Sequence, residues 1–100
     1  MAITTRVSET GDKVIISVTG KFDFQLYDDF RSAYTDTEGP GVSYEVNLAG
    51  TDYLDSSALG MLLLLREHAG GDSSNIQITE VPDEVRKVLE VANFGKLFSI

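Results

Sequence analysis

Two kinds of hydrophobic spacing alternate along the chain, and the first is typical of β-strands. "TTRVSET" (4–10) alternates weakly between polar and apolar residues, as an edge strand does, and "KVIISV" (13–18) is rich in β-branched residues. "GD" at 11–12 is a turn signal between them, so the two segments predict an N-terminal hairpin. Three later stretches of similar character predict further strands: 42–50, 75–81 and 96–100.

The second kind of spacing predicts three helices. In residues 25–36 apolar side chains recur at helical intervals, and "TEGPG" (37–41) ends the segment. Residues 56–70 form a second, strongly apolar helix that a pair of glycines closes. Pro82 suits the first position of a third helix, and the two acidic residues after it are favourable in a first turn. The apolar stripe of that helix consists of Val85, Val88, Leu89 and Ala92.

Strands and helices alternate from the hairpin onward, which implies right-handed crossovers and a largely parallel sheet. The sequence therefore predicts one α/β domain over residues 1–100, with a mostly parallel sheet, an N-terminal hairpin and three helices. In such sheets functional residues collect at the carboxyl ends of strands. "YLDSSALG" (53–60) lies at such an end, between the predicted strand 42–50 and the helix 56–70.

A helical wheel separates two faces of the helix at 56–70. An advance of about 100° per residue directs one set of side chains toward the sheet: Ala58, Leu62, Leu65 and Ala69. Gly60, Leu63, Leu64 and Glu67 fall on the opposite side, with Ser56 one turn before Gly60. Gly costs a helix roughly 1 kcal/mol relative to Ala, but here it would leave room for another protein to approach the Ser56 hydroxyl. Alternatively, neighbouring elements cover both sides of the helix and leave no such strip exposed.

Composition narrows the classes of function. The formal net charge of −8 disfavours binding to nucleic acid and to anionic membranes, whereas it would steer a basic protein partner toward the surface. The chain has no cysteine, which excludes disulfides and a thiolate nucleophile. The N-terminal residues show no signal peptide, and "MLLLL" (61–65) is too short to cross a bilayer, which takes about 20 residues. We expect a soluble cytoplasmic protein.

The second helix begins at "DSS", residues Asp55, Ser56 and Ser57, whose types allow several kinds of chemistry. A serine nucleophile needs a base within hydrogen-bond reach. His68 is the only histidine, and it lies roughly 18 Å from Ser56 along an intact helix at 1.5 Å per residue. A direct Ser–His pair is therefore excluded, and His68 is placed to complement the helix dipole. Ser and Asp are also preferred N-caps, worth about 1 kcal/mol each, so capping could explain Asp55 or Ser56.

The aspartates in the same region allow a second interpretation, in which a carboxylate and not a serine accepts phosphate. Asp52 and Asp55 could ligate Mg²⁺, or one of them could accept phosphate as a receiver domain does, with Lys96 in place of the lysine of that class. A receiver needs an acidic pair after an early strand, where Asp23 stands alone. The chain is also short for that class.

A second "DSS" at 72–74 lies in a glycine-rich loop and is typical of a turn. The tripeptide alone therefore indicates no function, and only its position between a strand and a helix makes the first copy a candidate site.

Three segments resemble the STAS domain family, and in particular the bacterial anti-sigma factor antagonists. "DSSALG" (55–60) is similar to the signature of that family. "SVTGKFD" (17–23) resembles its second strand and turn, and "VRKVLEVANFGKLFSI" (85–100) resembles its last helix, turn and final strand. The resemblance spans nearly the whole chain. Ala58 stands where the common pattern often has Gly, which could narrow the partners that fit.

The resemblance implies a regulatory binding module that is not an enzyme and needs no cofactor or metal of its own. Family members bind a partner when unphosphorylated. A serine kinase, often the anti-sigma factor itself, phosphorylates the first serine after the aspartate, and a metal-dependent serine phosphatase reverses this. Carried over, the acceptor is Ser56. With the outward strip of the second helix, the expected partner-binding residues are Asp23, Asp55, Ser56, Ser57, Gly60, Leu63 and Leu64. Some STAS domains serve transporters or other complexes, so a non-sigma STAS subunit is an alternative, beside the receiver-like domain.

Overall fold

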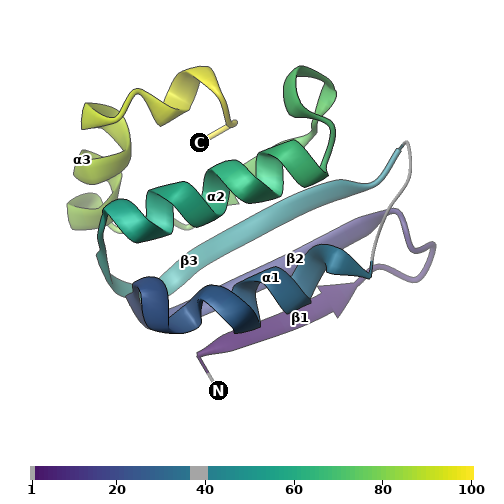
Figure 1. The fold of residues 1–100 in the computed structure, drawn as a ribbon, viewed down its shortest axis with the longest axis horizontal. Helices are drawn as coiled ribbons and strands as arrows, with labels where there is room; N and C mark the ends of the chain where they lie inside the picture. Colours follow the sequence, from purple (N-terminus) through teal and green to yellow (C-terminus); the bar gives the residue numbers. More distant parts are fainter. Residues whose placement is uncertain (1, 37–40) are drawn as a thin grey trace.

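A four-stranded sheet organises the protein (Figure 1), whose computed structural model describes residues 2–36 and 41–100. The strands lie in the order in which they occur in the chain: β1 (Ile3–Val7), β2 (Lys13–Phe22), β3 (Ser43–Leu54) and β4 (Ile76–Thr79). β1 pairs antiparallel with β2, and the other two pairings are parallel. The predicted hairpin and largely parallel sheet are confirmed. Of the predicted break at 37–41, only Gly41 lies within the described residues.

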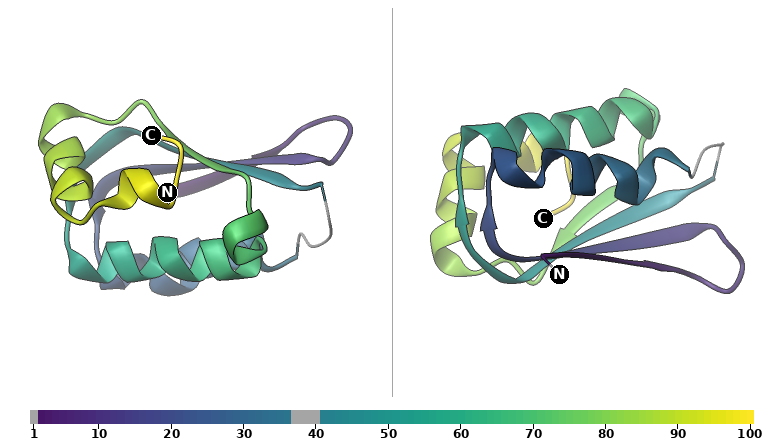
Figure 2. Two further views of the ribbon diagram at one scale, coloured as in Figure 1. Left: turned by 90° about the horizontal axis from the view of Figure 1, so that it is seen from above. Right: turned by 60° about the horizontal axis from the view of Figure 1, so that its bottom comes forward.

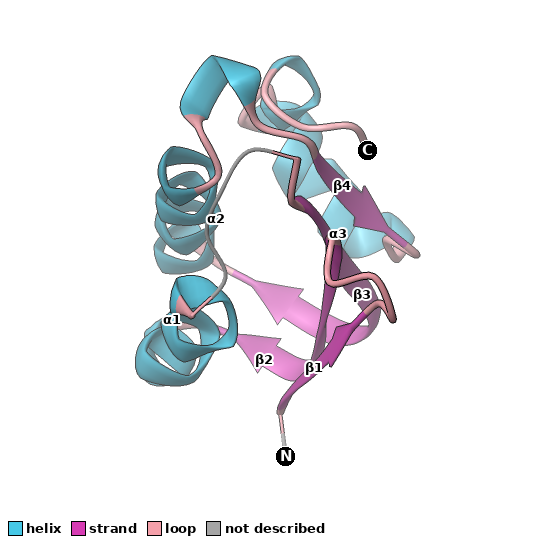
Figure 3. Cartoon of the chain, turned by 90° about the vertical axis from the view of Figure 1, so that its right-hand side faces the viewer, coloured by secondary structure: helices cyan, strands magenta, loops and turns pink. Residues whose placement is uncertain are grey.

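The three predicted helices are present, and their bounds are α1 (Tyr27–Thr35), α2 (Ser56–His68) and α3 (Asp83–Val91). A short 3₁₀ turn, η1 (Phe24–Leu26), leads into α1. α1 and α2 lie side by side on one face of the sheet (Figures 2 and 3), and α3 lies across the end of the sheet at which α2 begins (Figure 1). Pro82 is the N-cap of α3 and not its first residue, one position from the prediction.

The core lies between the sheet and the helices α1 and α2, and buried residues of α3 and η3 join it. Alternate residues of β2 and β3 are buried there because successive side chains of a strand point to opposite faces. On α2, Ala58, Leu62 and Leu65 are fully buried while Gly60 and Glu67 are exposed, so the predicted helix phase is confirmed. Met61 joins the core as well.

The other face of the sheet is mostly polar, and within the described residues no helix covers it (Figure 3). Lys13 of β2 and Glu45 of β3 form an ion pair there at 3.0 Å, and the Thr79 hydroxyl of β4 donates to the same carboxylate at 2.9 Å. These contacts lower the pKa of Glu45, the Lys13 hydrogen bond first and the Thr79 hydroxyl second. On this solvated face, side-chain contacts therefore link the three strands β2, β3 and β4.

β3 runs four residues further than predicted, and a close approach to β2 accompanies the extension. Thr19 and Gly50 are partners in the ladder, and irregularities in register flank this part of β2. A Cβ at Gly50 would lie 2.6 Å from the Thr19 Cγ2 methyl. A residue without a side chain therefore fits here, and the chain continues in extended form to Leu54, directly before the "DSS" residues.

The predicted final strand at 96–100 is wrong. Asn93 adopts a left-handed backbone conformation with φ 59° and starts a short 3₁₀ turn, η3 (Phe94–Lys96). Phe98 is buried and stacks on Phe94 with 5.3 Å between ring centroids. Only Ser99 then reaches β4, where it forms an isolated parallel bridge with Gln77. Packing of the two phenylalanines therefore takes precedence over strand propensity in this segment.

Candidate functional site

The candidate site lies at the edge where β2 and β3 end. Phe22 and Leu54, the last residues of the two strands, are partners in the parallel register. Asp23 and Asp55 follow them directly, so the sheet brings together two predicted site residues that are far apart in sequence. The 3₁₀ turn before α1 and the helix α2 both start at this edge (Figure 1).

Asp55 is the N-cap of α2. Its Oδ1 accepts hydrogen bonds from the backbone N–H groups of Ser57 at 3.0 Å and Ala58 at 3.3 Å. The Ser57 hydroxyl donates to the same oxygen at 2.6 Å. That hydroxyl contributes most to lowering the pKa of Asp55, and the two backbone donors add to the effect. Capping thus accounts for Asp55, as one of the sequence alternatives predicts.

The two serines of the motif differ in accessibility and in hydrogen bonding. Ser57 is half-buried, and its hydroxyl is held by Asp55. Ser56 is the first residue of α2 and is exposed, and no described residue forms a hydrogen bond with its hydroxyl. An enzyme that transfers a group to this segment would meet the Ser56 oxygen first.

An exposed strip on α2 continues from Ser56. We use outer strip for Ser56, Gly60, Leu63 and Leu64. A Cβ added to Gly60 would meet no atom within 4 Å, so the space in front of it is open. Leu63 is 39% exposed and Leu64 47% exposed, which rules out the alternative that neighbouring elements cover both sides of α2.

Two exposed aromatic residues at the same edge were not singled out by the sequence patterns. Phe24 is 67% exposed and stacks on Tyr27 with 5.4 Å between ring centroids. Tyr53 is 47% exposed and is the partner of Lys21 in the ladder. Phe24 directly precedes the predicted helix at 25–36, and a large apolar residue outside that helical pattern was a usable signal in the sequence. Asp23 itself caps η1, its Oδ1 accepting from the Gln25 N–H at 3.0 Å.

The remaining carboxylates offer no metal centre within the described residues, where no group of three or more acidic or histidine side chains converges. Asp52 is exposed on β3, and Asp28 and Asp29 lie in the first turn of α1. Lys96 lies in η3.

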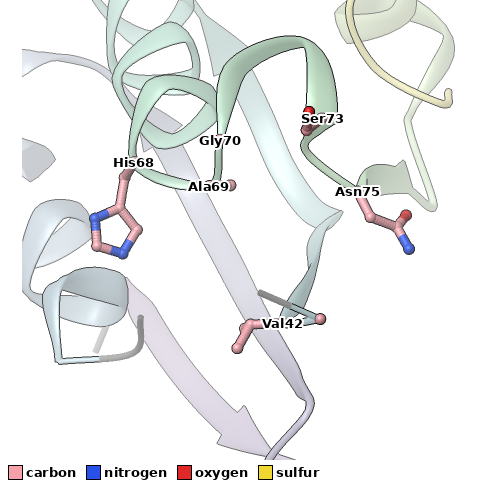
Figure 4. A pocket seen from close by; sticks show the side chains of 7 residues that line it. Val42, His68, Ala69, Gly70, Ser73 and Asn75 are labelled. Carbon is pink, nitrogen blue, oxygen red and sulfur yellow. The ribbon is translucent and has the colours of Figure 1, made fainter. Parts of the chain in front are cut away.

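His68 lies at the other end of α2, in its last turn, as predicted. Its ring is 4.9 Å from that of Tyr34 and 6.2 Å from that of Tyr44, centroid to centroid. It borders a hollow of about 400 Å³, with Ser73 and Asn75 on another side of it (Figure 4).

The second "DSS" belongs to this distant loop. Asp72 forms an ion pair with Arg66 of α2 at 2.7 Å, and η2 (Gly71–Ser73) is a 3₁₀ turn. The turn predicted for these residues is confirmed. Ser73 is exposed but has no long helix behind it, which makes it a control for Ser56.

Comparison with known families agrees with this geometry. Residues 5–99 match the family model described as "Mlab, STAS domain". The chain belongs to the STAS domain family. The match includes the Asp55–Gly60 motif and the carboxyl ends of β2 and β3, so the candidate site is part of the STAS domain. The family match gives the receiver-like alternative no support.

One relative of this STAS domain is a STAS-domain containing protein from Pseudomonas aeruginosa (strain UCBPP-PA14). The two are 48% identical over 100 residues, which is 100% of this chain and 99% of the relative. Within the described residues, no helix has both the length and the apolar character that crossing a membrane requires.

Solved structures share the fold at lower identity. The anti-sigma factor antagonist SpoIIAA in its unphosphorylated form matches with a TM-score of 0.80 and 19% identity over 97% of this chain and 85% of the other. An anti-sigma factor antagonist from Mycobacterium paratuberculosis matches with a TM-score of 0.74 and 21% identity over 96% and 82%. A sulfate transporter family protein from Wolinella succinogenes matches with a TM-score of 0.73 and 15% identity over 91% and 73%. At these identities the likeness concerns the fold: this STAS domain has that of anti-sigma factor antagonists.

Proposed function

We propose that the protein is a partner-binding switch of the anti-sigma factor antagonist kind, controlled by reversible phosphorylation of Ser56. The partner is an anti-sigma factor, which in this class is often the serine kinase, and a metal-dependent serine phosphatase restores the binding form. The protein itself performs no catalysis and holds no cofactor. The resemblance of "DSSALG" to the family signature supports this function, as does the likeness to a structure described as an unphosphorylated form.

The observation that carries the proposal is the difference between the two serines. The Ser57 hydroxyl is used in the cap of α2, whereas the Ser56 hydroxyl projects into solvent beside the outer strip. A phosphate on Ser56 would therefore leave the cap intact. It would also place a dianion next to Leu63 and Leu64, which are exposed apolar side chains.

Charge explains how the switch acts on binding. Phosphorylation adds roughly −1.5 to −2 charge at pH 7. A dianion enclosed in an apolar interface loses its water without compensation, and an unpaired buried charge costs several kcal/mol. About 1.4 kcal/mol corresponds to a factor of ten in affinity, so we expect partner affinity to fall about 100-fold or more. Release by charge needs no large change of fold.

Site mapping tests the acceptor. Tagged wild-type protein, Ser56→Ala, Ser57→Ala and Ser73→Ala are isolated from cells and examined by phosphate-affinity electrophoresis and mass spectrometry. We expect the phosphorylated species to disappear only in Ser56→Ala. A phosphate on Ser57 or Ser73 in the wild type would contradict the proposal, as would a hydroxylamine-labile phosphate on an aspartate.

Partner capture tests the switch. Equal amounts of wild type, Ser56→Asp and Leu64→Asp are used as bait, with Ser73→Asp as the control for added charge. Wild type and Ser73→Asp should retain the same partner, and the other two variants should lose it. A partner that remains bound to both Ser56→Asp and Leu64→Asp would place the interface elsewhere.

A second candidate is a constitutive STAS subunit of another complex. The match to the "Mlab, STAS domain" model and the fold shared with a sulfate transporter family protein favour it. In that case Ser56 carries no phosphate in cells, and the captured partner is a component of that complex. The two experiments above therefore separate the candidates.

A further inference from the structure

A second surface adjoins the outer strip, between α2 and α3. An open groove of about 350 Å³ has a wholly apolar lining, which consists of Leu59, Val88, Val91, Ala92 and the side-chain stem of Lys87. Val91 is 85% exposed, the highest value among the large apolar residues in the described part of the chain. The groove exists because α3 packs mainly on β3 and not on α2.

A smaller hollow of about 190 Å³ continues this groove toward the end of β3. The two share Val88, and Asp52 and Glu84 are among the residues that line the smaller one. Both acidic side chains are exposed, and neither forms an ion pair with another described residue. The combined surface therefore has an apolar part and an acidic end. We call it the α2–α3 groove.

The helices that line the groove indicate the secondary structure of a segment that would bind in it. Where the groove lies between two helices, their backbone groups are already hydrogen-bonded, so an extended peptide would find no strand edge to pair with. A helix satisfies its own backbone and offers side chains at i, i+3, i+4 and i+7 to such a groove. The two unpaired carboxylates, on a protein of net charge −8, complement a basic side chain at one end of that helix.

We propose that the α2–α3 groove binds an amphipathic helix of a partner protein, with apolar side chains against Val88 and Val91 and a basic side chain against Asp52 and Glu84. The surface is continuous with the outer strip, because Leu59 lies four residues before Leu63 and so neighbours it on the same helix face. The occupant can be a second segment of the partner that covers the outer strip. The inference does not depend on phosphorylation, since it uses only the unmodified surface.

A designed peptide tests the groove with the protein as it exists. The probe has about 15 residues, enough for a marginal helix in water, with Leu at i, i+3, i+4, i+7 and Lys elsewhere. It is titrated into ¹⁵N-labelled protein at low salt. The two comparison peptides are the same pattern with Glu in place of Lys, and a scrambled Leu/Lys sequence. We expect shifts centred on Leu59, Glu84, Val88 and Val91 with the amphipathic Leu/Lys peptide, and binding at least tenfold weaker with either comparison peptide.

Variants assign the binding to this groove. Val91→Asp changes an exposed side chain and should weaken binding at least tenfold, and Glu84→Lys should weaken it severalfold and flatten its salt dependence. Val7→Asp is the matched control, since Val7 is 54% exposed on β1, and it should bind as wild type. Thermal melts confirm that each variant is folded. Unchanged binding by Val91→Asp, equal binding of the scrambled peptide, or shifts confined to Leu63 and Leu64 would overturn the inference. None of these outcomes bears on whether Ser56 is phosphorylated.

Discussion

Gly60 is a position where stability and binding should respond in opposite directions. Gly in a helix interior is roughly 0.5–1 kcal/mol less favourable than Ala, and a methyl group here meets no atom within 4 Å. Gly60→Ala should therefore raise the free energy of unfolding by about that amount. Urea denaturation measures this, and partner affinity of the same variant should fall because the methyl group projects from the outer strip.

Gly95→Ala is the control for that prediction. Gly95 also has open space at its Cβ position, but it lies in η3 and is not part of the outer strip. Its substitution should leave partner affinity unchanged. A Gly60→Ala variant that binds as tightly as wild type would mean that the partner does not approach α2 at this turn.

The Asp55 cap makes stability depend on pH in a definite direction. Its hydrogen bonds lower the pKa of Asp55 in the folded protein, the Ser57 hydroxyl most. The contribution of this carboxylate is therefore fully present above its unfolded pKa, about 3.9, and is lost as the pH falls through the lower folded value. Asp55→Ala should cost about 1 kcal/mol at pH 7.

The cost of Asp55→Ala should shrink as the pH is lowered below about 4, which denaturant titrations at pH 7 and pH 3 would show. Asp52→Ala removes an exposed neighbouring carboxylate that lies outside the cap, so its effect should be small at both values. An Asp55→Ala cost that is the same at pH 7 and pH 3 would contradict the charged cap.

At the scale of elements, α2 has two faces with different energetics. Leu62 is fully buried and Leu64 is 47% exposed, two residues apart in the same helix. Leu62→Ala should lower the free energy of unfolding by about 2–5 kcal/mol, because it removes contacts and leaves a cavity. Leu64→Ala should change it by less than about 1 kcal/mol while it weakens partner binding. Equal costs in equilibrium denaturation would mean that the helix phase is wrong.

The existence and type of these elements could be predicted from sequence because most of them show a helical or strand-like spacing of apolar residues. Their ends depend on contacts between distant segments, which periodicity does not contain. β3 reaches Leu54 through "GTDYL", which carries turn-forming residues but pairs with β2 as far as Phe22. The prediction of a strand at 96–100 was wrong because the spacing of apolar residues does not show that Phe98 is buried.

In the candidate site, too, the sequence predicted which segment is involved, while contacts between residues decided the details. The motif at 55–60 located Ser56, but which serine is free depended on the direction of the Ser57 hydroxyl. That Asp23 and Asp55 follow two paired residues depended on the register of β2 against β3. The exposure of Val91 could have been predicted from the sequence, because Val91 lies outside the apolar stripe formed by Val85, Val88 and Leu89.

At the scale of the whole molecule, phosphorylation of Ser56 should leave the fold intact. The N–H groups and the positive end of the α2 dipole favour an anion there, whereas Asp55 and Asp52 repel it. These terms oppose each other, so the change in stability should be about 1 kcal/mol in either direction. For a domain of this size that is a shift in Tm of about 4–8 °C.

Thermal melts of the unmodified and the Ser56-phosphorylated protein measure the shift, with Ser73→Ala phosphorylated in parallel to exclude a second site. Partner affinity is determined on the same samples. A far lower unfolding temperature for the phosphoprotein would contradict release by charge. It would indicate that the partner is released because the domain unfolds.

The contact between Thr19 and Gly50 has a consequence for how related sequences can vary. A methyl group at position 50 would force the Thr19 side chain out of its rotamer, at a cost of about 0.5–1.5 kcal/mol, whereas Ser at position 19 lacks the clashing Cγ2. Gly50→Ala should therefore destabilise the wild type more than it destabilises Thr19→Ser, and a double-mutant cycle would give this difference as a coupling energy. Evolution should face the same constraint. In an alignment of this family, positions 19 and 50 should covary, with a side chain at 50 accompanied by a residue without a γ-methyl group at 19.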